Sequence, residues 1–90
     1  MNRKLIHELV DLVLDVNEAG DYATFELPSS YIHTAHVNHM KGGHDKSREY
    51  DHWELLFNND DLKREIKYFR NRLAELKNAP SGGNPSQGQN

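Results

Sequence analysis

The spacing of apolar residues changes twice along this chain, from helical to alternating and back to helical. Near the N-terminus, Leu5, Leu9, Leu12 and Val16 recur every three or four residues. Near the C-terminus, the same spacing joins Leu62, Ile66, Phe69, Leu73 and Leu76. Apolar and polar residues alternate in parts of the segment between them. Because a helix repeats every 3.6 residues and a strand every two, the pattern predicts two helices that flank a group of strands.

The segment between the helices divides into three predicted strands, 22–27, 31–40 and 50–57. A Pro28-Ser29-Ser30 turn separates the first two, and a polar loop containing Gly42-Gly43 separates the last two. The predicted fold is therefore α+β, in the order α-β-β-β-α: a three-stranded antiparallel meander with two helices packed on one face. One domain is predicted over residues 1–78. Residues 79–90 contain no large apolar side chain, so we expect a disordered tail there.

A specific strand register is predicted from the apolar residues. Leu27 opposite Tyr31, and Met40 opposite Tyr50, would gather the apolar side chains of all three strands on one face. That face would carry Ala23, Phe25, Leu27, Ala35, Val37, Trp53, Leu55 and Phe57. The other face would carry Tyr22, Thr24, Glu26, Thr34, His36, Asn38, His52 and Glu54. His36 would then pair with Glu54, and Asn38 with His52.

Composition excludes several classes of protein. The chain has no cysteine, which excludes disulfides and thiolate metal sites. No apolar run is long enough to span a bilayer, and no signal peptide is recognisable, so we expect a cytoplasmic protein without membrane contact. The net charge of −3 argues against a nucleic-acid binder. Residues 1–59 carry −5 and residues 60–78 carry +2, so the second helix is the only basic element.

Five of the six histidines lie between residues 33 and 52. On the predicted polar face, His36, His52 and Glu54 would form a set of ligands suited to zinc. The same His–Glu couple could serve acid–base catalysis. The sequence has no established metal-binding spacing and no nucleophile motif. We therefore expect no metal, no cofactor and no enzymatic activity, and a metal-binding protein or a small enzyme is kept as a distant alternative.

The loop after residue 40 is the predicted contact loop. Lys41, Lys46 and Arg48 stand beside Gly42-Gly43, and backbone N–H groups with cations can hold an anion. In that alternative an oligomer would bind a small anionic ligand such as a nucleotide, with His44 on its phosphates and Tyr50 stacked on its base. A glycine pair is more often only a turn.

The order of elements across residues 3–77 resembles that of double-stranded-RNA-binding domains. Asp60 and Asp61 lie where that family has phosphate-binding lysines, so no RNA-binding residue is carried over. The short acidic αβββα chain is also similar in size and layout to small accessory proteins of phages and mobile elements, including anti-defence proteins. That resemblance implies an inhibitor or adaptor that blocks a partner protein, often as a dimer.

The broad apolar arc of the first helix is more than one sheet face needs to cover, and its flank could contact a partner. We therefore predict a homodimer. Partner or ligand contacts are predicted at His36, Asn38, Lys41, His44, Lys46, Arg48, Tyr50, His52 and Glu54.

Overall fold

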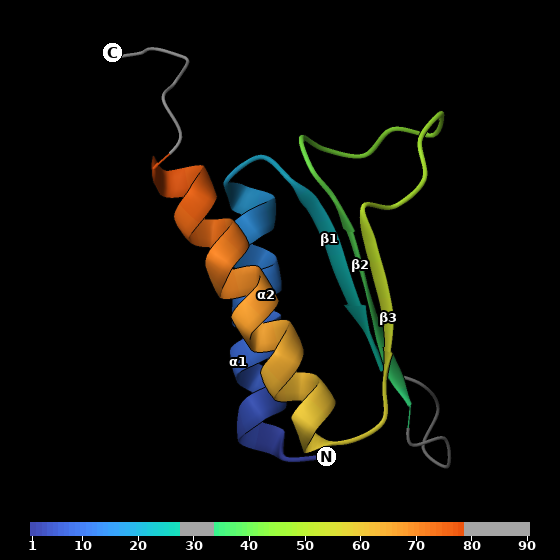
Figure 1. Cartoon of the computed structure of the whole chain (residues 1–90), viewed down its shortest axis with the longest axis vertical. Helices are drawn as coiled ribbons and strands as arrows, with labels where there is room; N and C mark the ends of the chain where they lie inside the picture. Colours follow the sequence, from blue (N-terminus) through green and yellow to red (C-terminus); the bar gives the residue numbers. More distant parts are fainter. Residues whose placement is uncertain (28–33, 79–90) are drawn as a thin grey trace.

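The computed structural model describes residues 1–27 and 34–78. It confirms the predicted α+β fold in the order α-β-β-β-α (Figure 1). The elements are α1 (Arg3–Glu18), β1 (Tyr22–Glu26), β2 (Ala35–Met40), β3 (His52–Leu56) and α2 (Asn59–Asn78). The predicted turn at 28–30, the first residues of the predicted second strand and the predicted tail at 79–90 lie outside the described residues.

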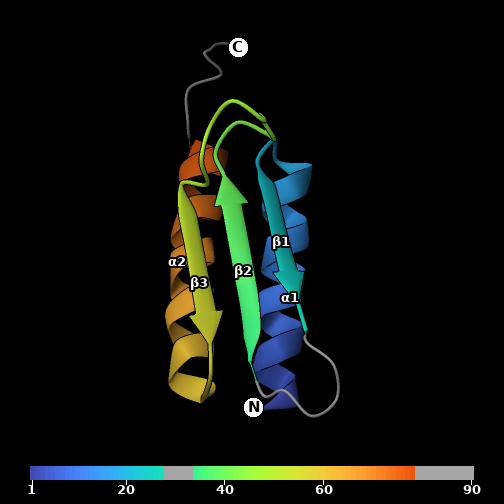
Figure 2. The same cartoon turned by 90° about the vertical axis from the view of Figure 1, so that its right-hand side faces the viewer.

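The two helices form one layer and the sheet forms the other. The strands run antiparallel in the order β1-β2-β3. Figure 2 shows the sheet in front of the helices, with α1 behind β1, α2 behind β3, and no helix over the near face. The core lies between the layers, and its fully buried members are Leu9, Val16, Ala35, Val37, Leu56, Leu62 and Phe69. We call the uncovered side of the sheet the outer face.

Helix α1 has a capped start and a glycine end. The side chain of Asn2 accepts a hydrogen bond from the N–H of Leu5 at 3.1 Å, which satisfies one of the free N–H groups of the first turn. Gly20 follows the helix with a φ of +112°, a conformation that favours glycine. The side chain of Asn17 then bonds the backbone of Ala23, so the end of α1 is tied directly to β1.

Helix α2 begins with two side-chain hydrogen bonds to backbone N–H groups. The side chain of Asn58 accepts from the N–H of Asp61 at 2.9 Å, and the carboxylate of Asp61 accepts from the N–H of Phe57 at 2.7 Å. The N-terminal ends of the helices lie together, since the N–H of Asn2 donates to the side chain of Asn59 at 2.7 Å. The two helices therefore run in the same direction side by side (Figure 1). No helix in the described part of the chain has the length and apolarity to cross a membrane.

The predicted register between β2 and β3 is wrong by one residue. Ala35 pairs with Leu56 and His39 with His52, so His36 lies opposite Leu55 and not Glu54. A shift of one residue turns every side chain of a strand to the other face. Leu56 is fully buried against the helices, whereas Trp53 is 49% exposed and Leu55 is 40% exposed on the outer face. The apolar set of the third strand thus points away from the core.

The predicted register between β1 and β2 is also wrong, with a milder consequence. Phe25 pairs with Val37 and Tyr22 with Met40, whereas Leu27 opposite Tyr31 would have paired Ala23 with Ala35. The displacement is even, so each side chain keeps its predicted face. Ala23, Ala35 and Val37 accordingly line the core as predicted.

Candidate functional site

The outer face carries a group of large apolar side chains on an edge strand. Trp53 and Leu55 project from β3, and Phe57, which directly follows this strand, is 58% exposed. An antiparallel sheet with one free face normally turns polar side chains to water. Three large apolar side chains side by side are the kind of patch that marks interaction surfaces. We call Trp53, Leu55 and Phe57 the apolar strip.

The centre of the outer face is polar and largely satisfied within the protein. Nε2 of His36 lies 3.4 Å from a carboxylate oxygen of Glu26, and its ring lies 6.0 Å from that of Trp53. The side-chain amide of Asn38 donates to the hydroxyl of Thr24 at 3.0 Å. The amide oxygen of Asn38 is buried and has no hydrogen-bond partner among the described residues. His36 and Asn38 therefore border the apolar strip, on the predicted face.

His52 and Glu54 lie on the other side of the sheet, contrary to the prediction. Nε2 of His52 is 2.6 Å from Oε1 of Glu65 in α2, and Glu54 lies 3.6 Å from the guanidinium of Arg64. His36 therefore does not share a metal site with His52 and Glu54, because His36 and His52 point to opposite faces of the sheet. Across the described residues, no group of three or more His, Asp or Glu side chains is arranged to hold a metal ion.

The predicted contact loop is held together by its own charges. The guanidinium of Arg48 donates to the carbonyl of Lys41 at 2.8 Å and lies 3.5 Å from Asp51 and 3.8 Å from Asp45. The carboxylate of Asp51 also accepts from the N–H of Lys41 at 2.7 Å, and this bond holds the pKa of Asp51 below its usual range. Arg48 is consequently committed to the loop itself.

Gly42, the first residue of the glycine pair, binds a carboxylate of the protein itself. The N–H of Gly42 donates to Oδ1 of Asp21 at 2.9 Å, and Gly42 has a φ of +81°. The glycine N–H that was predicted to hold the anion of a ligand thus holds an internal carboxylate instead. Of the other predicted loop residues, His44 packs its ring on Tyr22 at 4.8 Å, while Lys46 and Tyr50 are exposed.

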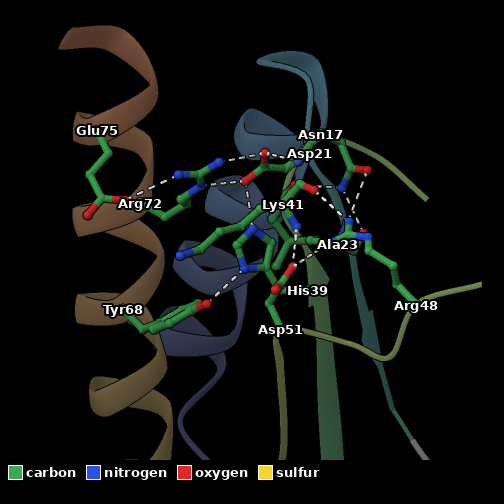
Figure 3. Close-up of polar contacts among 12 residues, drawn as sticks. Asn17, Asp21, Ala23, His39, Lys41, Arg48, Asp51, Tyr68, Arg72 and Glu75 are labelled. Atoms are coloured by element: carbon green, nitrogen blue, oxygen red, sulfur yellow. Dashed lines mark hydrogen bonds and ion pairs between the residues drawn. The ribbon is translucent and has the colours of Figure 1, made fainter. Parts of the chain in front are cut away.

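A buried polar cluster, absent from the predicted site residues, ties this end of the sheet to α2 (Figure 3). His39 is completely buried, with Nε2 2.6 Å from Oδ2 of Asp21 and Nδ1 2.8 Å from the hydroxyl of Tyr68. The carboxylate of Asp21 also accepts two bonds from the guanidinium of Arg72, at 2.6 and 3.0 Å. With the Gly42 N–H, groups from β2, α2 and the loop between β2 and β3 therefore meet on the carboxylate of Asp21.

The second histidine couple lies directly beside the first. His39 and His52 are paired residues of β2 and β3. The ring of Tyr68 stacks on that of His52 at 3.8 Å, while its hydroxyl contacts His39. Glu65, the partner of His52, is fully buried. Tyr68 thus connects two carboxylate–histidine couples across the sheet–helix interface.

The contacts within the cluster shift the pKa values of Asp21 and Tyr68 in opposite directions. Burial opposes ionisation of Asp21, but hydrogen bonds from Arg72, the Gly42 N–H and His39 outweigh it and hold its pKa well below its usual range. Burial, with the negative charges of Asp51 and Glu65, raises the pKa of Tyr68 to about 12. Tyr68 therefore stays neutral and is a poor nucleophile or base near pH 7.

A small cavity adjoins this cluster. The adjoining cavity measures about 150 Å³ and is lined by Lys41, Tyr68, Asn71, Arg72 and Glu75. Arg72 is already engaged by Asp21 and Glu75, so it is not available to an external anion. We interpret the cluster as a structural connection that ties β2, β3 and α2 in one arrangement.

Two signals in the sequence could have indicated the cluster. Glu65 precedes Ile66 inside the apolar arc of α2, where an acid is expected only with a buried partner. His39 alternates with Ala35 and Val37 and so falls on the predicted apolar face of the sheet, where a histidine also needs partners. Nothing in the sequence pattern indicated that Asp21 and Tyr68 would be the partners of His39, because both residues are far from it along the chain.

No known protein family, curated protein or solved structure matches this chain. The candidate site is therefore defined by the chain's own geometry. The apolar strip is an open surface bordered by the half-buried His36 and the buried Asn38, whereas the cluster around His39 is closed.

Proposed function

We propose that this protein is a non-enzymatic binding protein that covers a surface of a partner protein with its outer face. The observation that carries the proposal is the outward position of Trp53, Leu55 and Phe57, each 40% exposed or more. Burial of exposed apolar area contributes roughly 25 cal/mol per Å². A partner that covered the strip would remove this area from water, and tryptophan is among the residues that most often dominate binding energy.

The charges around the strip favour a protein partner over a nucleic acid. The outward-facing residues of the three strands are Tyr22, Thr24, Glu26, His36, Asn38, Met40, Trp53 and Leu55. They include no lysine or arginine, whereas phosphate contacts supply most of the affinity for nucleic acids. The one acidic residue among them, Glu26, lies 3.4 Å from Nε2 of His36. The partner surface that fits this face is apolar at its centre and carries few charges.

The proposed mode of action is occlusion. A small protein that covers an apolar surface prevents other molecules from using it, as in the phage and mobile-element anti-defence inhibitors that the chain resembles in layout. We place this action in the cytoplasm, with which a chain that lacks cysteine is compatible. Of the predicted loop contacts, the exposed residues His44, Lys46 and Tyr50 would then form a polar rim beside the strip. Lys41 lines the cavity at α2, and Arg48 is held by Asp45 and Asp51.

Trp53 provides a direct test, because it is the only tryptophan. The tagged full chain would be used to capture partners from its host. Each captured protein would be purified and titrated onto the chain by calorimetry and by tryptophan emission. The proposal expects saturable binding with a shift of the emission to shorter wavelength, as Trp53 leaves water.

Substitutions would locate the contact. Trp53→Ser should weaken binding by about 2 kcal/mol or more, roughly thirtyfold. Leu14→Ser is the matched control, because Leu14 is 55% exposed on α1, away from the outer face. A complex with unchanged Trp53 emission, or equal losses for both variants, would overturn the proposal. A nucleotide-induced rise in thermal stability that Lys46→Ala with Arg48→Ala abolishes would instead favour the small-anion alternative.

A further inference from the structure

The side of the helical layer that faces away from the sheet carries two charged stripes of opposite sign. The acidic stripe consists of Glu8, Asp11, Asp15 and Glu18 of α1. The basic stripe consists of Lys63, Lys67, Arg70 and Lys77 of α2. The residues of each stripe are three, four or seven positions apart, so they lie on one face of their helix. This face is offset by one residue from the buried positions of the same helix. All of these side chains are exposed except that of Glu8, which is half-buried.

The two stripes border the same grooves between α1 and α2. One groove, of about 410 Å³, is lined by Glu8 and by Lys63 and Lys67, with Leu5 and Ile66 among its apolar residues. The second, of about 350 Å³, has Asp15 and Glu18 on one wall and Leu73 and Lys77 on the other. The helical layer therefore offers apolar residues between an acidic and a basic wall.

Most of these charges have no ion-pair partner among the residues that the structure describes. Arg70 forms an ion pair with Glu8 across the groove. Within residues 1–27 and 34–78, the other six members of the two stripes form no ion pair. Exposed charges cost little when solvated, but parallel stripes of opposite sign are complementary to a second copy of the same surface.

The sign of both stripes changes at the same end of the molecule. One turn before Glu8, α1 presents Lys4, and three residues before Lys63, α2 presents Asp60. The N-terminal ends of the helices are side by side through the bond between Asn2 and Asn59. The acidic stripe thus begins with a cation and the basic stripe begins with an anion, near the same height along the layer.

We propose that a second copy of this chain docks on the helical layer and forms a two-fold symmetric dimer. A two-fold axis parallel to the helices would place α1 of each copy over α2 of the other. The acidic stripe of each copy then faces the basic stripe of the other, and Lys4 of each copy faces the region of Asp60 in the other. A two-fold axis across the helices would instead put like charges together, so the charge pattern selects one arrangement.

This dimer leaves both outer faces exposed on opposite sides of a four-layer assembly. The inference does not depend on the proposed function, because it involves the other side of the molecule. If both hold, each dimer carries two partner-binding surfaces, and a partner with two copies of the recognised surface would be bound with added avidity.

Sedimentation velocity of the full chain over a range of concentrations and salt tests the proposal. We expect a monomer–dimer equilibrium that shifts toward monomer with added salt, since the screening length falls from about 10 Å at 0.1 M to about 3 Å at 1 M. A protein that stays monomeric at millimolar concentration in low salt would overturn the inference. So would a dimer that is insensitive to salt.

Charge reversal provides the sharper test. Lys63→Glu with Lys67→Glu, and separately Asp11→Lys with Asp15→Lys, should each weaken dimerisation at least about tenfold. An equimolar mixture of the two variants should restore a dimer, because each helix again meets an opposite charge. Lys41→Glu with Lys46→Glu is the matched control, as it changes the net charge of the chain equally on the contact loop.

Folding of each variant would be verified by circular dichroism and thermal melting. Restoration in the mixture cannot arise from misfolded chains, so this arm separates a lost interface from a lost fold. Reversal variants that dimerise like the wild type, or a mixture that stays monomeric, would overturn the proposal. Loss of the dimer in Trp53→Ser would also overturn it, because it would place the contact on the outer face.

Discussion

Leu55 and Leu56 are neighbours in β3, but Leu56 is completely buried while Leu55 is 40% exposed on the opposite face. The alternation of Trp53, Leu55 and Phe57 had predicted the opposite arrangement, with Leu55 buried and Leu56 exposed. The chain thus forms its core with Leu56 and leaves the more apolar set of positions facing outward. This choice creates the surface on which the proposed function rests.

Substitution of each leucine by alanine measures how much its side chain contributes to the free energy of unfolding. Leu56→Ala should lower the free energy of unfolding by about 2–5 kcal/mol, since it leaves a cavity between the layers. Leu55→Ala should change it by less than about 1 kcal/mol, since its side chain is already partly in water. Urea denaturation of both variants provides the comparison. A larger loss for Leu55→Ala would show that β3 pairs in the other register.

The pair of His52 and Glu65 should account for much of the preference for this register. Glu65→Ala should lower the free energy of unfolding by about 3 kcal/mol, because it leaves a half-buried histidine without its partner. Glu54→Ala is the matched control, since its contact with Arg64 at 3.6 Å is exposed on both sides, and we expect a change of less than about 1 kcal/mol.

A double-mutant cycle would isolate the contribution of this pair. If His52→Ala costs much less in the Glu65→Ala background than in the wild type, the two side chains are coupled as the structure indicates. Strictly additive losses would show that each residue acts through other contacts.

Acid should destabilise the protein through Asp21. Its pKa is lower in the folded protein than in the unfolded chain, so the unfolded chain takes up the proton first as the pH falls. The stabilisation is complete at neutral pH and decreases below about pH 4, toward the folded pKa. Asp21→Asn should be less stable than the wild type at pH 7 and should lose less stability between pH 5 and pH 2. Chemical denaturation at several pH values checks this, and parallel profiles for the two proteins would contradict it.

The helices and the order of elements followed from the sequence because their determinants are local. The spacing of Leu62, Ile66, Phe69, Leu73 and Leu76 requires a helix. Asn58 and Asp61 provide its cap from neighbouring positions. Gly20 ends α1 without help from distant residues. Such signals act within a few residues, so they can be recognised in the sequence without the rest of the fold.

The faces of β3 were decided by the tertiary structure. Both faces of this strand carry residues that could be buried, Trp53 and Leu55 on one and His52 and Leu56 on the other. Alternation alone favours the first set. The second set is buried because α2 offers Glu65 and Tyr68 at the matching position, and those partners satisfy His52.

The same distinction separates the predicted loop from the observed one. The sequence determined that glycine N–H groups and cations would stand together after β2, in an arrangement suited to an anion. Only the fold brought Asp21 and Arg72 to that place. Asp21 is 21 residues from Gly42 along the chain, and Arg72 is 51 residues from Asp21. Periodicity, caps and glycine positions are local properties of the chain, whereas the partner of a buried charge is chosen by packing between elements that are distant in sequence.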